Sequence, residues 1–182
     1  MLDKLKEYTE LHPFFTTNLF ENGVGVIIDP SIPESQYIAI NVDKYYHKLS
    51  LPQTPAIVDL LIVGKNNNEE KFHIFIVEMK NINGENGFKC HNIYEKFTTV
   101  IEDFMKIRYQ DPFLNENYNV IECKLFFIND AYHFSENGYT KDEYSSFLKG
   151  TKIEILQSMP PFEYRGFYLF IDYEIPNPLL KW

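Results

Sequence analysis

Residues 55–81, which read PAIVDLLIVGKNNNEEKFHIFIVEMKN, contain two apolar segments separated by a polar turn rich in asparagine. The pattern predicts a β-hairpin, because both segments are rich in β-branched and aromatic residues. The first segment nevertheless carries Asp59, and the second ends in Glu78 and Lys80. A charge inside an apolar strand is unfavourable unless it is paired, hydrogen-bonded or bound to a metal. Any fold of this chain therefore has to compensate Asp59.

The centre of the turn determines which residues face each other across the hairpin. If it lies between residues 68 and 69, Asp59 is opposite Glu78. Opposed residues of an antiparallel pair share a face, with Cβ atoms about 4.5–5.5 Å apart. Lys80 lies on the same face as Glu78, because side chains alternate along a strand. This register, which a slip of one residue would destroy, predicts two carboxylates and one ammonium group at one end of the sheet.

Two neighbouring carboxylates suit a hard divalent cation such as Mg²⁺ or Mn²⁺, which prefers oxygen ligands. Such an ion offsets the repulsion between the carboxylates and lowers the pKa of a bound water. A lysine beside it can orient that water or contact a phosphate oxygen. The predicted cluster is typical of metal-assisted hydrolysis of phosphodiester bonds.

The pattern of Asp59 followed by Glu78-Met79-Lys80 resembles the PD-(D/E)xK nuclease superfamily, which includes many type II restriction enzymes and Holliday-junction resolvases. The resemblance covers roughly residues 1–130. It implies a restriction-endonuclease-like mixed β-sheet flanked by helices. It also implies that Asp59, Glu78 and the main-chain carbonyl of Met79 bind Mg²⁺ or Mn²⁺, and that Lys80 is the catalytic lysine.

The sequence departs from the superfamily pattern at one position and leaves another unassigned. Val58 stands where a proline usually precedes the aspartate. The superfamily often has a further glutamate on its first helix, and Glu7, Glu10 and Glu21 are all candidates for it. The number of metal ligands therefore stays open at this point.

A structural interpretation of the same charges is also possible. Asp59 and Lys80 could form a salt bridge, with Glu78 solvated at the strand end. Lys89 and Lys96 flank the candidate site in the sequence, and we expect them at solvated loop and helix positions.

A second match to the lysine motif occurs in the segment IECK at 121–124. Its alternation of apolar residues predicts that Glu122 and Lys124 face solvent, so we interpret this match as fortuitous. His73 is expected on the face of the hairpin opposite Asp59, in a packing role.

The remaining elements predict a mixed α/β (α+β) fold for a single domain of residues 1–182. Helices are expected at 2–12, from Pro13 through 22, at 92–108 and at 140–150, the last capped by Thr140. Strands are expected at 23–29, 36–46, 119–129, 151–156 and 165–175.

Composition restricts the partners and the compartment. The net charge is −9 and there are two arginines, which argues against a broad nucleic-acid surface but allows a local lysine-lined groove. No apolar signal segment or membrane-length run is seen, and we expect a cytoplasmic protein. The preferred hypothesis is an endonuclease acting on DNA, as a possible homodimer because cutting a duplex needs two sites. The alternative is a catalytically inactive nuclease-fold module that binds protein or nucleic acid.

Overall fold

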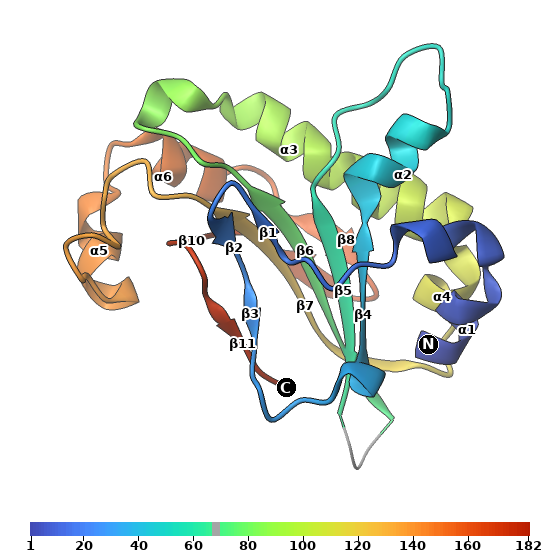
Figure 1. Cartoon of the computed structure of the whole chain (residues 1–182). Helices are drawn as coiled ribbons and strands as arrows, with labels where there is room; N and C mark the ends of the chain where they lie inside the picture. The colour runs from blue at the N-terminus through green and yellow to red at the C-terminus, as the bar shows by residue number, and fades with distance from the viewer. Residues whose placement is uncertain (67–69) are drawn as a thin grey trace.

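A five-stranded mixed sheet with the strand order β10-β7-β6-β5-β4 forms the centre of the computed structural model (Figure 1). The structure describes residues 1–66 and 70–182. β10, β7 and β6 run parallel to one another, whereas β6, β5 and β4 pair antiparallel. Helices flank this sheet, which confirms the predicted mixed α/β class. The strands of the central sheet are β4 (Tyr37–Asn41), β5 (Leu60–Lys65), β6 (Lys71–Met79), β7 (Asn119–Ile128) and β10 (Ile171–Glu174).

The predicted hairpin forms in the predicted register. Leu60 pairs with Val77, and Val63 pairs with Ile74. The same register places Asp59, which immediately precedes β5, opposite Glu78. The centre of the turn, at residues 67–69, lies outside the described residues.

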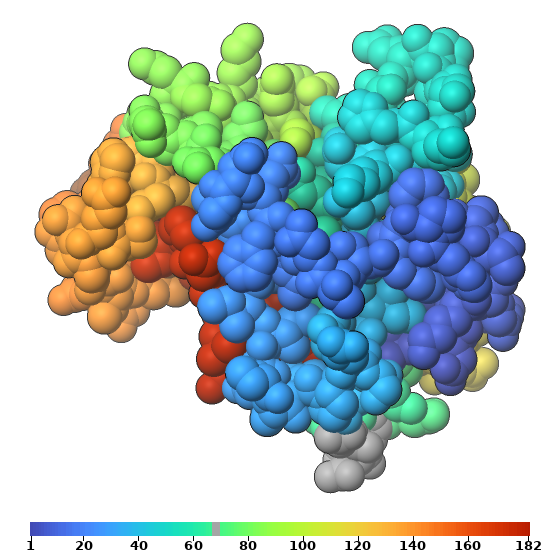
Figure 2. Space-filling view, in the orientation of Figure 1, coloured from blue at the N-terminus to red at the C-terminus, as the bar shows by residue number. Residues whose placement is uncertain are grey.

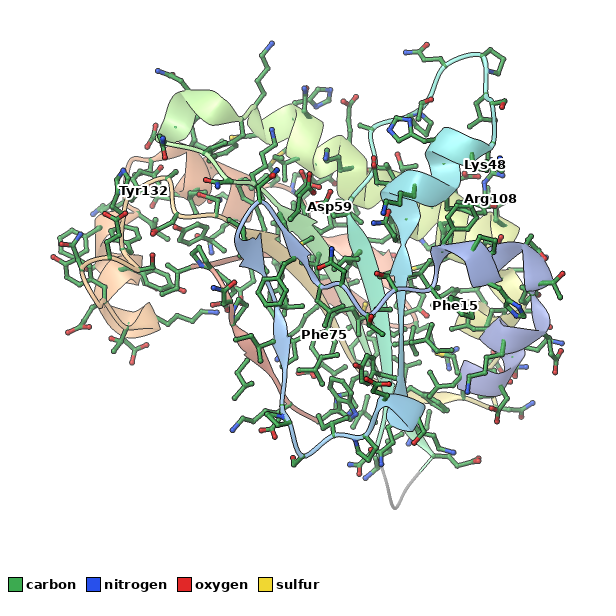
Figure 3. All side chains as sticks on the ribbon, viewed as in Figure 1. Phe15, Lys48, Asp59, Phe75, Arg108 and Tyr132 are labelled. Carbon is green, nitrogen blue, oxygen red and sulfur yellow. The ribbon has the colours of Figure 1, made fainter. Side chains whose placement is uncertain are left out.

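One face of the sheet is covered by short strands from the two ends of the chain. Figure 2 shows the N-terminal segment, in blue, over the front of the molecule. The buried residues of this side include Phe75, labelled in Figure 3, together with Val26 and Leu180. The covering strands are β1 (Phe20–Glu21) paired with β2 (Val24–Gly25), and β3 (Ile27–Ile28) paired with β11 (Leu179–Leu180).

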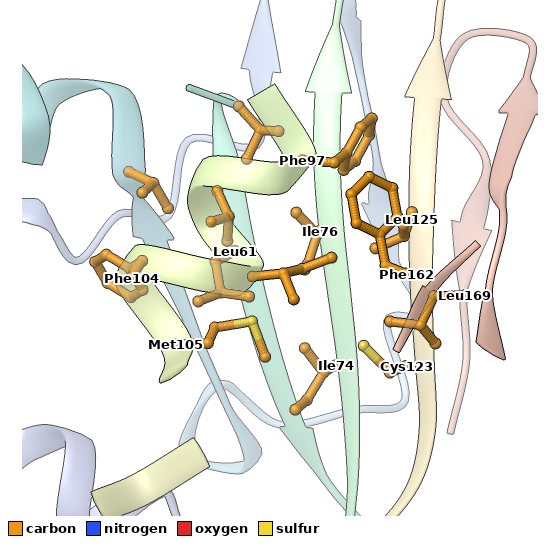
Figure 4. Packing of buried hydrophobic residues seen from close by; sticks show 14 of the residues in the cluster. Leu61, Ile74, Ile76, Phe97, Phe104, Met105, Cys123, Leu125, Phe162 and Leu169 are labelled. Atoms are coloured by element: carbon orange, nitrogen blue, oxygen red, sulfur yellow. The ribbon is translucent and has the colours of Figure 1, made fainter. Parts of the chain in front are cut away.

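The opposite face carries the larger core, against which the longest helical segment packs. Figure 4 shows Phe97 and Phe104 of that segment over Leu61 and Ile76 of the hairpin. The segment begins as an α-helix and continues as a π-helix, a rare winding. The helices are α1 (Leu2–Glu7), η1 (Thr9–Phe14), α2 (Val42–Lys48), η2 (Glu34–Gln36), η3 (Glu85–Gly87), α3 (Cys90–Thr98), the π-helix η4 (Thr99–Arg108), α4 (Gln110–Leu114), α5 (Lys141–Phe147) and α6 (Lys152–Gln157). A small hairpin of β8 (Phe162–Tyr164) and β9 (Phe167–Leu169) completes the elements.

The helix predicted from Pro13 through residue 22 is wrong. Pro13 lies inside η1, and the chain beyond Phe14 is extended. Thr16 Oγ1 accepts a hydrogen bond from the Asn18 N–H at 3.0 Å, and Asn18 Oδ1 accepts one from the Phe20 N–H at 3.2 Å. Such local bonds from Thr and Asn side chains offer the backbone an alternative to a helix.

Two predicted strands are also corrected. The strand expected at 36–46 ends at Asn41, because the Asn41 side chain accepts a hydrogen bond from the Lys44 N–H at 2.8 Å and caps α2. Residues 151–156 belong mainly to α6, where Thr151 is the N-cap and Ile153 and Leu156 are buried three residues apart. The capping box at Thr140 forms as predicted.

Gly64 of β5 lies directly beside the ring of Trp182, the single tryptophan. A Cβ atom at residue 64 would lie 2.5 Å from Cε2 of this ring. The indole Nε1–H also donates a hydrogen bond to the Lys65 carbonyl oxygen at 3.2 Å. The glycine therefore permits the close packing of Trp182 on the sheet.

We expect Gly64→Ala to displace the Trp182 ring and to lower the free energy of unfolding by about 1–3 kcal/mol, the usual range for overpacking. Tryptophan fluorescence and urea denaturation would measure both effects. In a Trp182→Ala background the same substitution should be neutral or stabilising, because alanine restricts the unfolded chain more than glycine does. An equal cost in both backgrounds would show that the ring contact is not the cause.

Candidate functional site at the ends of strands β5 and β6

Asp59 and Glu78 lie together at one end of the central hairpin, on the side covered by α3. Ile76, two residues before Glu78, packs in the core on the helix side, so the alternation of β6 directs Glu78 to that same side. Figure 3 labels Asp59 at this end of the sheet, below α3. The arrangement of the two carboxylates on one face is as the sequence predicts.

Glu78 is completely buried, with 0% of its surface exposed. Its Oε1 atom accepts a hydrogen bond from Lys96 Nζ of α3 at 2.7 Å, in an ion pair. Its Oε2 atom is also buried and has no hydrogen-bond partner among the described residues. The carboxylate is therefore half satisfied, because one of its two oxygens lacks a partner among the described residues.

The role of Lys96 was missed by the prediction that it occupies a solvated helix position. Its side chain is only 24% exposed, because it turns inward to Glu78. A signal for this was present in the sequence. Lys96 lies three residues after Ile93 and four before Val100, both buried, and so falls on the apolar stripe of its helix.

Asp59 is half-buried and bonded to the backbone of the neighbouring strand. Its Oδ2 atom accepts a hydrogen bond from the Met79 N–H at 2.6 Å. Glu21 of the β1–β2 hairpin lies close to Asp59, because both residues line one pocket. Of the three glutamates that the sequence leaves as candidates for a further ligand, Glu21 thus lies at the site. Glu7 instead pairs with Lys4 at 2.9 Å.

Lys80 does not form the salt bridge of the structural interpretation. Its Nζ donates a hydrogen bond to the Gly87 carbonyl oxygen at 3.2 Å. No Asp59–Lys80 ion pair occurs in residues 1–66 and 70–182, and Glu78 is buried rather than solvated. Lys80 is nevertheless close enough for its charge to favour the ionised form of Glu78.

Both carboxyl groups have raised pKa values. Burial, followed by the charge of Asp59, raises the pKa of Glu78 to about 8, although Lys96 opposes the shift. Burial raises the pKa of Asp59 to about 7, against the Met79 hydrogen bond and the charge of Lys96, and Glu21 adds to the rise. Two acidic groups whose pKa values are raised in this way are stabilised when a proton or a cation binds between them.

The second lysine motif is compensated differently. Glu122 forms an ion pair with Lys124 Nζ at 2.6 Å, and its other carboxylate oxygen is hydrogen-bonded to His73 Nδ1 at 2.9 Å. His73 lies on the face opposite Asp59, as expected, near Trp182. Glu122 alternates with the buried Cys123 and Leu125, as predicted, but its side chain is only 27% exposed because it pairs with His73. The residue displaced by the bulge in β7 is Ile121, which is 40% exposed. Unlike Glu78, Glu122 has a lowered pKa.

Asp59 and Glu78 are the side chains that could hold a cation at this end of the sheet. In the part of the chain that the structure describes, no three His, Cys, Asp or Glu side chains form a ready-made metal site. Mg²⁺ commonly keeps several waters and binds to proteins through one or two carboxylates. Two carboxylates are therefore enough protein ligands for this ion.

Comparison of the sequence with protein-family models, with curated proteins and with solved structures found no match. The described helices are all too short or too polar to cross a membrane. The interpretation of the site therefore depends on its own geometry and charges.

We expect Lys96→Met to lower the free energy of unfolding by about 3–5 kcal/mol above pH 8, because it leaves a buried carboxylate without its cation. The cost should shrink near pH 6, where Glu78 is protonated. Lys106→Met is the matched control on the adjoining η4, since Lys106 pairs with the half-exposed Glu102 and such pairs are worth about 1 kcal/mol or less. Urea denaturation would measure both, and equal costs would contradict a buried role for Lys96.

The raised pKa values also predict how stability depends on pH. The folded protein holds protons on Asp59 and Glu78 at pH values where the unfolded chain has lost them, so stability should fall as pH rises from about 5.5 to 8.5. Asp59→Asn should flatten this slope. A stability that rises with pH across this interval would contradict the raised values.

Proposed function

We propose that the chain is a metal-dependent endonuclease of the PD-(D/E)xK type, which hydrolyses phosphodiester bonds in DNA. The observation that carries the proposal is the opposed pair of Asp59 and Glu78 at the end of a buried hairpin, with Lys80 two residues further along. The pair is costly for a merely structural site, since one buried oxygen of Glu78 has no partner among the described residues.

The residues present suit Mg²⁺ or Mn²⁺. Asp59, the free oxygen of Glu78 and the main-chain carbonyl of Met79 would hold the ion. When bound, it would supply a water of lowered pKa and positive charge for the phosphate. Glu21, beside Asp59, would orient Asp59 or a water of the ion.

The protein groups around the carboxylates have distinct roles in this proposal. Lys96 fixes one oxygen of Glu78 and leaves the other without a partner among the described residues, so that this second oxygen could bind the ion. Lys80 would contact a phosphate oxygen or orient the attacking water, once its ammonium group leaves the Gly87 carbonyl. Because that hydrogen bond is with an exposed backbone group, its loss costs little in water.

The second candidate function is a nuclease-fold module that binds without cutting. The observation in its favour is that Lys80 bonds to Gly87 and not to either carboxylate. The net charge of −9 also favours a protein partner over a duplex. The nuclease proposal includes a homodimer only if the substrate is a duplex, because cutting both strands needs two sites.

Incubation of the protein with supercoiled plasmid in Mg²⁺ or Mn²⁺ separates these candidates. We expect nicking or cutting by the wild type, and a loss of about 10²–10⁴-fold with Lys80→Met, the range for a general acid or base. Asp59→Asn should be inactive. Glu122→Gln, in the second lysine motif, is the matched control and should retain activity, whereas equal losses in all three variants would contradict the assignment.

Metal should also stabilise the wild type against heat. At about 100 times the dissociation constant, an ion that binds only the folded state adds about 2.7 kcal/mol, which raises the melting temperature by several degrees. Asp59→Asn should melt at or above the metal-free wild type, because it removes a repulsive charge, and should lose most of the metal shift. A wild type that metal does not stabilise would contradict the proposal.

A further inference from the structure

A pocket of about 230 Å³ opens beside the candidate site, between the β1–β2 hairpin and α2. Its lining includes Asp59 and Glu21 from the site, Phe20 from β1, and Lys44 from α2. In Figure 2 the hairpin and α2, in blue and cyan, lie on the same face of the molecule. The pocket thus extends the site toward two groups that no step of the proposed hydrolysis uses.

Phe20 is an exposed aromatic ring held in a fixed place. It is 44% exposed, and it pairs across the hairpin with Gly25. A Cβ atom at residue 25 would lie 2.5 Å from Cδ1 of Phe20, so the absence of a side chain at Gly25 lets the ring pack on the backbone. The ring therefore presents its remaining surface to the pocket and to solvent.

The segment before Phe20 is fixed by hydrogen bonds. Thr16 N–H donates to the Ala39 carbonyl oxygen at 2.9 Å, which ties the segment to the edge strand β4. The Phe20 N–H donates to Asn18 Oδ1 at 3.2 Å. A ring whose backbone is already ordered loses little conformational entropy when a ligand stacks on it.

Lys44 is the cation among the described residues that line the pocket. Its backbone is fixed by the Asn41 cap, and its side chain is exposed. Asp43, the neighbouring carboxylate of the lining, lies 3.4 Å from His47. The exposed Lys44 thus contributes a positive charge to the pocket from α2, whereas Phe20 comes from the β1–β2 hairpin.

An aromatic face and a cation beside a hydrolytic site match one nucleotide of an unpaired strand. Base–aromatic stacking is the usual way in which proteins hold single strands, and it requires a base that is not stacked in a duplex. Lysine suits a backbone phosphate as a point charge. Carboxylates alone in the pocket would instead repel a nucleic acid.

We infer that this pocket binds one nucleotide next to the scissile phosphate, with its base stacked on Phe20 and its phosphate on Lys44. The inference depends on the proposed function and narrows its substrate to single-stranded or locally unpaired nucleic acid. A single subunit then suffices for cleavage, since one strand is cut at one site.

The test measures binding in the Asp59→Asn background, in which hydrolysis is blocked. The probes are a fluorescein-labelled 12-nucleotide single strand of thymidines and the duplex of the same length, compared by fluorescence anisotropy. We expect the single strand to bind more tightly. Adding Phe20→Leu should weaken single-strand binding about 10-fold, within the range for loss of one stacked base. Leucine keeps the apolar packing on Gly25 but lacks an aromatic face. Phe20→Trp keeps an aromatic face and should bind the single strand as the wild-type residue does.

Two matched controls belong to the same experiment. Phe170→Leu changes a ring that is 56% exposed, next to the opposite edge strand β10, and should leave binding unchanged. Lys44→Gln should reduce the slope of log affinity against log salt by about 0.7, the value for one phosphate contact on a single strand. Lys48→Gln, one turn further along α2, should leave the slope unchanged.

The outcomes separate this inference from the proposed function. Equal binding of duplex and single strand, no binding of either, or equal effects of Phe20→Leu and Phe170→Leu would overturn the inference. If the wild type cleaves plasmid and Phe20→Leu cuts single strands as well as the wild type does, the nuclease proposal is upheld and the nucleotide pocket is rejected. The expected binding pattern in a chain that cuts nothing would uphold the pocket and reject the hydrolysis.

Discussion

The burial of Glu78 is the constraint on which the rest of the site depends. A carboxylate with no exposed surface is unfavourable unless charges and donors around it compensate. Lys96 supplies one ion pair at 2.7 Å, and Asp59 on the facing strand works against it. The ion pair with Lys96 and the raised pKa of Glu78 both follow from this burial, and burial also raises the pKa of Asp59 beside it.

Buried charges of this kind are rarely the most stable solution for a core. Replacing a buried ion pair with apolar residues is often neutral or stabilising. The second lysine motif shows what a satisfied arrangement looks like in the same sheet, since Glu122 has both Lys124 and His73. Glu78 keeps one buried oxygen without a partner among the described residues, and such an atom calls for a functional explanation.

The hairpin and its register could be predicted from the sequence, because strand alternation fixes which side chains share a face. The position of Asp59 opposite Glu78 follows directly from that alternation. The contribution of Lys96 could have been found from its place on the apolar stripe of the helix. Helix α6 was harder to predict, since Ile153 and Ile155 also alternate as in a strand. The burial of Ile153 and Leu156, three residues apart, fits a helix instead.

The choice of Glu21 among the three candidate glutamates, and the pocket beside Asp59, could not be predicted from local patterns. Residues 14–22 have no strong period, and their path is set by side-chain hydrogen bonds from Thr16 and Asn18 and by the sheet edge at Ala39. Tertiary contacts thus overrode local preference there. The positions of functional side chains on such connecting segments are determined by the elements against which the segments pack.

A crystal structure of the protein soaked in Mn²⁺ tests the central claim most directly, because anomalous scattering locates the ion without reference to activity. We expect an anomalous peak for an ion bound by a carboxylate oxygen of Asp59 and by Oε2 of Glu78, with Lys96 still bonded to Oε1. A structure with no ion at these two carboxylates, in crystals whose other acidic surfaces bind Mn²⁺, would contradict it.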